Sequence, residues 1–171
     1  LVRSLSKNDE LRQQYIREMN FFVENDFAER LPEGEIPKFY MPHFPVVNES
    51  KASYKVRPVF NASAHLKGQL SLNDCIYDMP NLLPSSVEML LKFRSHKYGL
   101  IGDIRKAYMT VGVQPEFRNY LCFLWFSDKE LKHPRTFRMT RNCFGVKDAQ
   151  FNTIAVIREQ AKLFQNSKQR G

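Results

Sequence analysis

The sequence GDIRKAY, residues 102–108, decides how this chain is interpreted. It follows the apolar run 98–101, which predicts a buried strand that ends at Asp103. A carboxylate at the end of a buried strand is costly unless it has a partner, and a bound metal ion is one natural partner. A short turn after the strand would bring Tyr108 back beside this carboxylate. The segment therefore indicates a site for a metal-bound nucleotide.

Length and composition are those of a folded domain. The 171 residues include 43% apolar and 13% aromatic side chains, which suits one domain with a sizeable core or a piece of a larger one. Lysine and arginine outnumber aspartate and glutamate by 26 to 18, giving a net charge of +8. This surplus favours a polyanionic partner, although a basic surface that only keeps the protein in solution has the same signature.

Cysteine and histidine do not predict a zinc site. The three cysteines are scattered without a Cys-x-x-Cys pair, and the four histidines lack ligand spacing. Reduced thiols in an intracellular setting are therefore expected. There is no apolar run long enough to span a bilayer and no signal-peptide pattern, so no membrane partner is expected. The first residue is Leu1 rather than Met, which indicates a longer source protein.

Apolar periodicity and turn formers predict an α+β fold, with helices packed against a largely antiparallel sheet. The order of elements is α-β-β-α-β-β-β-α, and nothing marks an internal domain boundary. The predicted helices are 8–31, 85–94 and 148–164, and the predicted strands are 39–47, 53–62, 98–103, 120–126 and 136–140. The first two strands should form a hairpin around a turn at 48–50.

Local signals set several boundaries. Asn8 and Asp148 are placed to cap the first and the last helix, and Ser85 with Glu88 forms a capping box at the second. Pro32 ends the first helix. The apolar side chains expected to point inward from the second and the last helix are Val87, Leu90, Leu91, Ile154, Ile157, Ala161 and Phe164.

The long stretch 64–84 has little periodicity and many turn formers. Such a stretch is either a functional loop or a loop packed by its own side chains. Asn73 and Asp74 are predicted to hold it through side-chain hydrogen bonds to the backbone rather than to take part in chemistry. The polar, basic tail 165–171 should fray.

Several motifs in this order together resemble a known family, the reverse transcriptases of the BEL/Pao class of LTR retrotransposons. GDIRKAY resembles the family's motif A, and FGVKDAQF at 144–151 resembles its motif B. The fingers region is matched by YMPHFPVV at 40–47, KVRPVFNAS at 55–63, SLND at 71–74 and PNLL at 80–83. The match runs from about residue 39 to residue 164 in the family's order and spacing.

The resemblance implies a partial right-hand polymerase fold, with a fingers hairpin and an incomplete palm. It divides the chain into an N-terminal helix and linker at 1–37, a fingers-like region at 38–97, a partial palm with motifs A and B at 98–165, and a basic tail at 166–171. The implied activity of the complete enzyme is RNA-directed DNA synthesis, with two Mg²⁺ or Mn²⁺ ions that clamp the attacking and leaving oxygens.

The resemblance also implies roles for individual residues. Asp103 matches the first metal-binding carboxylate, and the backbone carbonyl of Ile104 would be a further oxygen ligand. Tyr108 matches the aromatic residue that lies under the deoxyribose and excludes a 2′-hydroxyl. Arg57 matches the arginine that grips the triphosphate, which its planar fork suits. Taken alone, Asp103 would be read as a strand-end cap and Tyr108 as a core residue.

Five further residues complete the predicted site. Lys55 and Lys51 lie on the same hairpin as Arg57 and could assist in binding nucleotide or nucleic acid. Gly145 would let the backbone approach the nucleotide and the template. Gln150 occupies a nucleotide-binding position of motif B, and Lys147 is a candidate contact to nucleic acid.

The chain also departs from the family pattern. Gln150 stands where the family usually has Pro, Asp148 where it has Ser or Asn, and Asn61 where it has Asp. The charge of Asp148 would lie near a base, which is a doubtful place for an anion. There is no Asp-Asp pair anywhere, and the chain stops at Gly171, where an aromatic-x-Asp-Asp hairpin is expected. We therefore expect that the isolated chain does not polymerise.

The implied partners are a dNTP, an RNA or DNA template-primer, and the remaining palm, thumb, RNase H and integrase regions of the same polyprotein. The implied location is the cytoplasm, within a virus-like particle, with a nuclear stage. A decayed or domesticated nucleic-acid-binding remnant without catalysis is the alternative, and a protein interaction domain on the same scaffold is a third possibility. Without a neighbour for the Asp103 strand, the excised chain should be poorly soluble.

Overall fold

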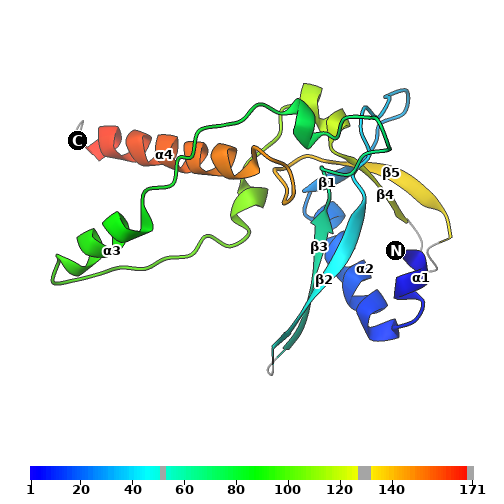
Figure 1. Ribbon diagram of the computed structural model, residues 1–171, viewed down its shortest axis with the longest axis horizontal. Helices are drawn as coiled ribbons and strands as arrows, with labels where there is room; N and C mark the ends of the chain where they lie inside the picture. The colour runs from blue at the N-terminus through cyan, green and yellow to red at the C-terminus, as the bar shows by residue number, and fades with distance from the viewer. Residues whose placement is uncertain (51–52, 127–131, 169–171) are drawn as a thin grey trace.

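The computed structural model describes residues 1–50, 53–126 and 132–168, and it has the mixed α+β structure that the sequence predicts. Two small antiparallel sheets and helix α2 (Asp9–Glu24) form one end of the molecule (Figure 1). Helices α3 (Ser86–Arg94) and α4 (Ala149–Lys168) extend away from the sheets toward the other end.

The first predicted helix begins as expected but ends early. A single turn of helix, α1 (Val2–Leu5), precedes it, and the Asn8 side chain caps α2 by accepting a hydrogen bond from a first-turn amide at 3.0 Å. The helix stops at Glu24 because Asp26 has a left-handed φ of 56°. Strand β1 (Ala28–Arg30) follows, so the predicted continuation to residue 31 is wrong.

The predicted hairpin is confirmed. Strand β2 (His43–Ser50) pairs with β3 (Ser53–Phe60) in an antiparallel register that joins His43 to Phe60 at its base. The turn predicted at 48–50 is wrong, because these residues continue β2 and are paired with β3. The connection lies at residues 51–52, outside the described ranges.

The second sheet has the strand order β1-β5-β4 and is antiparallel throughout. Strands β4 (Cys122–Phe126) and β5 (Pro134–Met139) confirm two of the predicted strands with shifted ends. Strand β1 was not predicted, because its three residues were assigned to the preceding helix. It forms by pairing with β5, which lies more than a hundred residues later in the chain.

Helix α2 and the two sheets enclose the core. Tyr15, Phe123 and Trp125 are the largest aromatic side chains that are almost completely buried there. The Trp125 ring meets Tyr15 edge to face at 5.8 Å between centroids, and its indole N–H donates to Asn20 of α2 at 3.2 Å. Burying each such ring stabilises the fold by about 2 kcal/mol or more. The base of the hairpin joins the same core through Phe60.

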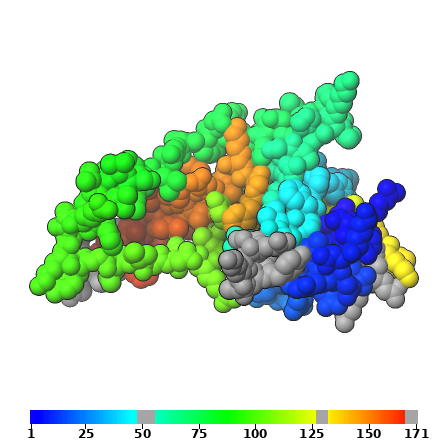
Figure 2. Space-filling model, turned by 60° about the horizontal axis from the view of Figure 1, so that its bottom comes forward, coloured from blue at the N-terminus to red at the C-terminus, as the bar shows by residue number. Residues whose placement is uncertain are grey.

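A segment that we call the arm, residues 86–104, lies apart from this core (Figures 1 and 2). It consists of α3 and the chain that returns from it, and its side chains are exposed although many are apolar. Leu100 is 97% exposed and Ile101 is 90% exposed. Such a surface is unusual for a soluble monomer and is typical of a face that another element covers.

Two predictions fail on the arm. The strand predicted at 98–103 has no regular structure, and the side chains of Val87, Leu90 and Leu91 are exposed rather than inward. A strand forms only beside another strand that satisfies its N–H and C=O groups, and within the described ranges none lies beside this run. Helix α3 begins where predicted, but Ser85 makes no side-chain capping bond to it in this part of the chain.

Helix α4 begins after Asp148, as predicted, and continues to Lys168, beyond the predicted end at 164. Of its predicted apolar stripe, Ile154 is half-buried, whereas the residues further along are exposed because the helix runs past the edge of the sheets: Ile157, Ala161 and Phe164. In the described ranges, neither this helix nor another is long and apolar enough to cross a bilayer.

The exposed arm predicts self-association of the purified chain. We expect concentration-dependent oligomers in sedimentation velocity, and a shift to monomer for the double variant Leu100→Asp with Ile101→Asp. The unfolding free energy should change by less than about 0.5 kcal/mol, because these exposed side chains contribute little to packing. Ile36→Asp is the matched control, since Ile36 is 76% exposed in the loop before β2 and should leave the oligomers intact. A monomeric wild-type chain would contradict this expectation.

Candidate functional site

Three segments that are far apart in the sequence meet at the base of the hairpin. They are the end of β3, the short helix η2 (Ala107–Thr110) and the turn at Phe144 and Gly145 that precedes α4. The ring of Tyr108 lies 4.4 Å from the ring of Phe144 between centroids, at an interplanar angle of 58°. Motif A and motif B are therefore in direct contact.

Gly145 places motif B against the hairpin. Its φ of +94° is one that side chains rarely adopt, so the predicted turn at this glycine is confirmed. A Cβ atom here would lie less than 3.0 Å from the carbonyl oxygen of Phe60, the last residue of β3. The backbone of motif B can approach the hairpin this closely only because residue 145 has no side chain.

Asn73 ties the long loop to both segments. It belongs to the short helix η1 (Asn73–Cys75), and its amide nitrogen donates to the Gly145 carbonyl at 2.9 Å and to the Ser63 hydroxyl at 2.8 Å. Its amide oxygen accepts from the backbone N–H of Lys147 at 2.9 Å. The predicted structural role of Asn73 is confirmed.

Asp74 also has the structural role predicted for it. Its carboxylate accepts hydrogen bonds from the hydroxyl and the backbone N–H of Ser71 at 2.7 and 2.9 Å. These bonds, the hydroxyl first, hold the pKa of the Asp74 carboxyl below its ordinary value. The loop is therefore packed by its own side chains at the point where it meets motif B.

Asp103 and Ile104 lie on the exposed end of the arm, immediately before η2. The backbone turns before η2 at Lys106, which has a left-handed φ of 52°. That this turn brings Tyr108 back beside the Asp103 carboxylate stays a prediction. Tyr108 is half-buried against Phe144 rather than part of the core. Its ring therefore packs against Phe144 while part of the residue stays exposed.

The metal-ligand set is incomplete. Within the ranges that the structure describes, no group of three or more His, Cys, Asp and Glu side chains is arranged to hold a metal ion. The Asp103 carboxylate and the Ile104 carbonyl offer two hard oxygens, which with phosphate oxygens could serve one Mg²⁺. By themselves these residues do not fit a two-ion centre, which needs carboxylates from outside the described ranges.

The hairpin presents Arg57 to solvent. Arg57 is paired with Val46 in the register and is exposed, whereas its neighbours Val56 and Pro58 are buried, because successive side chains of a strand point to opposite faces. Lys55 lies two positions nearer the hairpin tip. Lys51, the third predicted cation, lies outside the described residues.

Lys147 and Gln150 line a small cavity of about 230 Å³ between the start of α4 and the loop segment 78–83. The Lys147 ammonium pairs with Asp78 at 2.7 Å and donates to the Ile76 carbonyl at 3.3 Å. Lys147 remains exposed, and its ion pair with Asp78 links the loop to the start of α4 at the surface. Gln150 is exposed at the rim, where a ligand could reach it.

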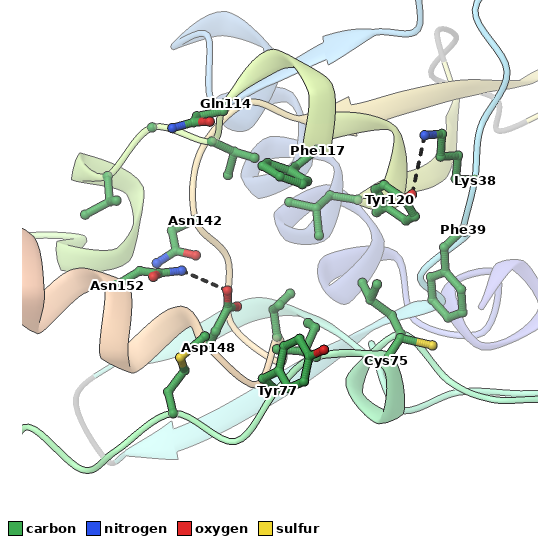
Figure 3. A pocket seen from close by; sticks show the side chains of 18 of the residues that line it. Lys38, Phe39, Cys75, Tyr77, Gln114, Phe117, Tyr120, Asn142, Asp148 and Asn152 are labelled. Atoms are coloured by element: carbon green, nitrogen blue, oxygen red, sulfur yellow. Dashed lines mark hydrogen bonds between the residues drawn. The ribbon is translucent and has the colours of Figure 1, made fainter.

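A larger cavity of about 1,090 Å³ lies on the other side of the loop (Figure 3). Two pairs of its polar groups are hydrogen-bonded, with Lys38 donating to the Tyr120 hydroxyl at 3.4 Å and Asn152 donating to the Asp148 carboxylate at 2.9 Å. The charge of Asp148 therefore has a partner and faces this cavity. Sequence reasoning missed the cavity, although the long loop that forms one wall was marked as functional or self-packed.

Comparison of the chain with protein-family models and with curated proteins gave no match. The motif resemblance and the meeting of the motifs in space are therefore the two grounds for assigning a function.

Proposed function

We propose that the chain is the fingers and the first part of the palm of a BEL/Pao-class reverse transcriptase. In a longer polypeptide it would contribute nucleotide gripping, sugar selection, one metal carboxylate and template contact to RNA-directed DNA synthesis. The observation that carries the proposal is the meeting of the hairpin base, Tyr108 and the Gly145 turn at one place. The order of these segments in the sequence does not require them to meet. A nucleotide pocket formed by all three segments would require it.

Each residue has a physical reason for its role. Arg57 is exposed on the hairpin, and its planar guanidinium can donate two parallel hydrogen bonds to phosphate oxygens. Tyr108 is positioned by Phe144, so its ring can present a fixed face to a sugar. Gly145 lets its turn pack directly on the end of β3, which sets the position of this exposed turn beside the hairpin. Asp103 and the Ile104 carbonyl would be two ligands of a metal centre whose other carboxylates come from outside the described ranges.

The exposed arm supports the same proposal. Its apolar run 98–101 has the composition of a buried strand but has no strand neighbour in the described ranges. A further part of the palm that pairs with this run would cover Leu100 and Ile101 and would fix Asp103 at the end of a strand. The predicted strand would then form on assembly.

A nucleic-acid-binding remnant without catalysis is the second candidate. The net charge of +8 and the basic hairpin favour it, because neither needs a metal ion. Sequence beyond residue 171 discriminates between the two, since only the enzyme requires an aromatic-x-Asp-Asp motif there. Binding of nucleic acid that does not depend on a divalent ion would favour the remnant.

Binding of a labelled primer–template, followed by fluorescence anisotropy over a salt series, tests the part of the proposal that lies in this chain. We expect affinity for the primer–template to fall steeply with salt. In a parallel titration with a labelled dNTP and Mg²⁺, we expect Arg57→Ala to weaken dNTP binding several-fold, because Arg57 is the proposed triphosphate grip. The matched control is Arg3→Ala, which removes the same charge from an exposed position on α1 and should leave binding near the wild-type value. Equal losses in the two variants would contradict a specific role for the hairpin.

A further inference from the structure

His43, the first residue of β2, uses both of its ring nitrogens inside the core. Its Nδ1 lies 2.6 Å from the Tyr15 hydroxyl of α2, and its Nε2 lies 2.8 Å from the Leu124 carbonyl oxygen of β4. A carbonyl oxygen can only accept, so Nε2 carries the hydrogen and Nδ1 accepts from the Tyr15 hydroxyl. When the ring is neutral, these two partners specify one tautomer, with the hydrogen on Nε2.

The surroundings of the ring disfavour a positive charge. His43 is 9% exposed, and the rings of Phe60, Phe123 and Trp125 lie 5.6 to 5.9 Å from it between centroids. Tyr15 is the titratable side chain in contact with it in this part of the structure, and burial raises the pKa of the Tyr15 hydroxyl. No carboxylate is among these contacts in the described ranges.

Burial is the main reason why the pKa of His43 lies below its ordinary value. The hydrogen bond to the Leu124 carbonyl acts in the opposite direction, and the N-terminal ammonium of the chain adds a smaller lowering effect. A protonated ring would donate from both nitrogens. The Tyr15 hydroxyl would then have to turn its own hydrogen into the aromatic core.

This histidine joins elements that the backbone ladders do not join. In the described ranges, β2 and β3 form one sheet, and β4 belongs to the other. Just before β2, the Met41 amide donates to the Cys122 carbonyl at 2.7 Å. His43 adds side-chain links from the same place to α2 and to β4, and so fixes the base of the hairpin on the core.

We propose that His43 is an acid-sensitive lock, which holds the β2–β3 hairpin on α2 and β4 while its ring is neutral and loosens that docking when the ring takes up a proton. The inference rests on the geometry of the ring and does not depend on the polymerase assignment. The folded state binds this proton less readily than the unfolded chain does. Stability is therefore full above the ordinary histidine pKa of about 6.5 and is lost progressively as the pH falls below it.

The sequence contains a single tryptophan, Trp125, which lies 5.9 Å from the His43 ring and so provides a local probe. An imidazolium quenches a neighbouring excited indole, whereas a neutral imidazole does so weakly. Between pH 8 and pH 5 we expect Trp125 emission to fall and the Tm to drop by about 3 °C for each pH unit below about 6.5. In His43→Gln, which cannot titrate, the Tm should be lower at pH 8 but nearly independent of pH across this range.

The control is His96→Gln, which removes an exposed histidine and should keep the wild-type pH dependence. A wild-type chain without this pH dependence, or a His43→Gln chain that retains it, would overturn the proposal. If His43→Gln does not fold, Tyr15→Phe replaces it as the test. This variant removes the donor to Nδ1, so the midpoint of the Trp125 quench should move to higher pH, and an unchanged midpoint would overturn the proposal.

Discussion

Replacing Gly145 with alanine is expected to destabilise the chain by about 3 kcal/mol or more, a large part of the total stability of a typical domain. Two costs add. The left-handed φ of +94° is unfavourable for a residue with a side chain, and the new Cβ would lie less than 3.0 Å from the Phe60 carbonyl oxygen. This obstacle is backbone at the end of a paired strand, so it cannot rotate away as a side chain could.

Gly34→Ala separates these two costs. Gly34 has a similar φ of +84°, but a Cβ there would meet no atom within 4 Å. It therefore carries only the conformational cost of about 1 kcal/mol. Urea unfolding of both variants measures the difference. A Gly145→Ala chain as stable as Gly34→Ala would show that motif B does not pack on the hairpin as described.

Elements with local signals could be predicted from the sequence. The Asn8 cap, the β2–β3 hairpin and the start of α4 after Asp148 each depend on residues that are close together along the chain. Strand β4 was also predictable, because a continuous apolar run of that length suits a buried strand.

The wrong secondary-structure predictions lie in segments whose structure depends on pairing with strands that are distant in the sequence. Strand β1 exists because β5 pairs with it, and helical spacing in its own sequence indicated the opposite. The run 98–101 has strand composition but stays exposed, since composition cannot supply a neighbouring strand. Whether the run 98–101 is exposed depends on the elements around it, and these cannot be read from its own four residues.

The candidate site shows the same division. Gly145 could be assigned to a tight turn from its motif. Its close packing against the Phe60 carbonyl, however, involves a segment more than eighty residues away in the sequence. Lys147 could be named as a basic residue of motif B, whereas its pairing with Asp78 required the loop to fold back over α4. The large cavity is lined by four segments that are distant in the sequence and had no local signal.

The second prediction is that the isolated chain does not catalyse nucleotidyl transfer. The chain offers one carboxylate at the proposed centre, Asp103, and its sequence holds no Asp-Asp pair. Nucleotidyl transfer by two ions needs carboxylates that bridge both. We therefore expect the chain to bind primer–template and to leave it unextended.

Primer extension on a fully bound complex is the decisive test of whether this chain holds a catalytic metal centre. A labelled primer–template is saturated with the chain, as judged by anisotropy, and is then given dNTPs and Mg²⁺. We expect a bound complex with no extension product, for the wild type and for Asp103→Ala alike. Extension by the wild type that Asp103→Ala abolishes would show a complete metal centre in this chain, and failure to bind primer–template would contradict the polymerase assignment itself.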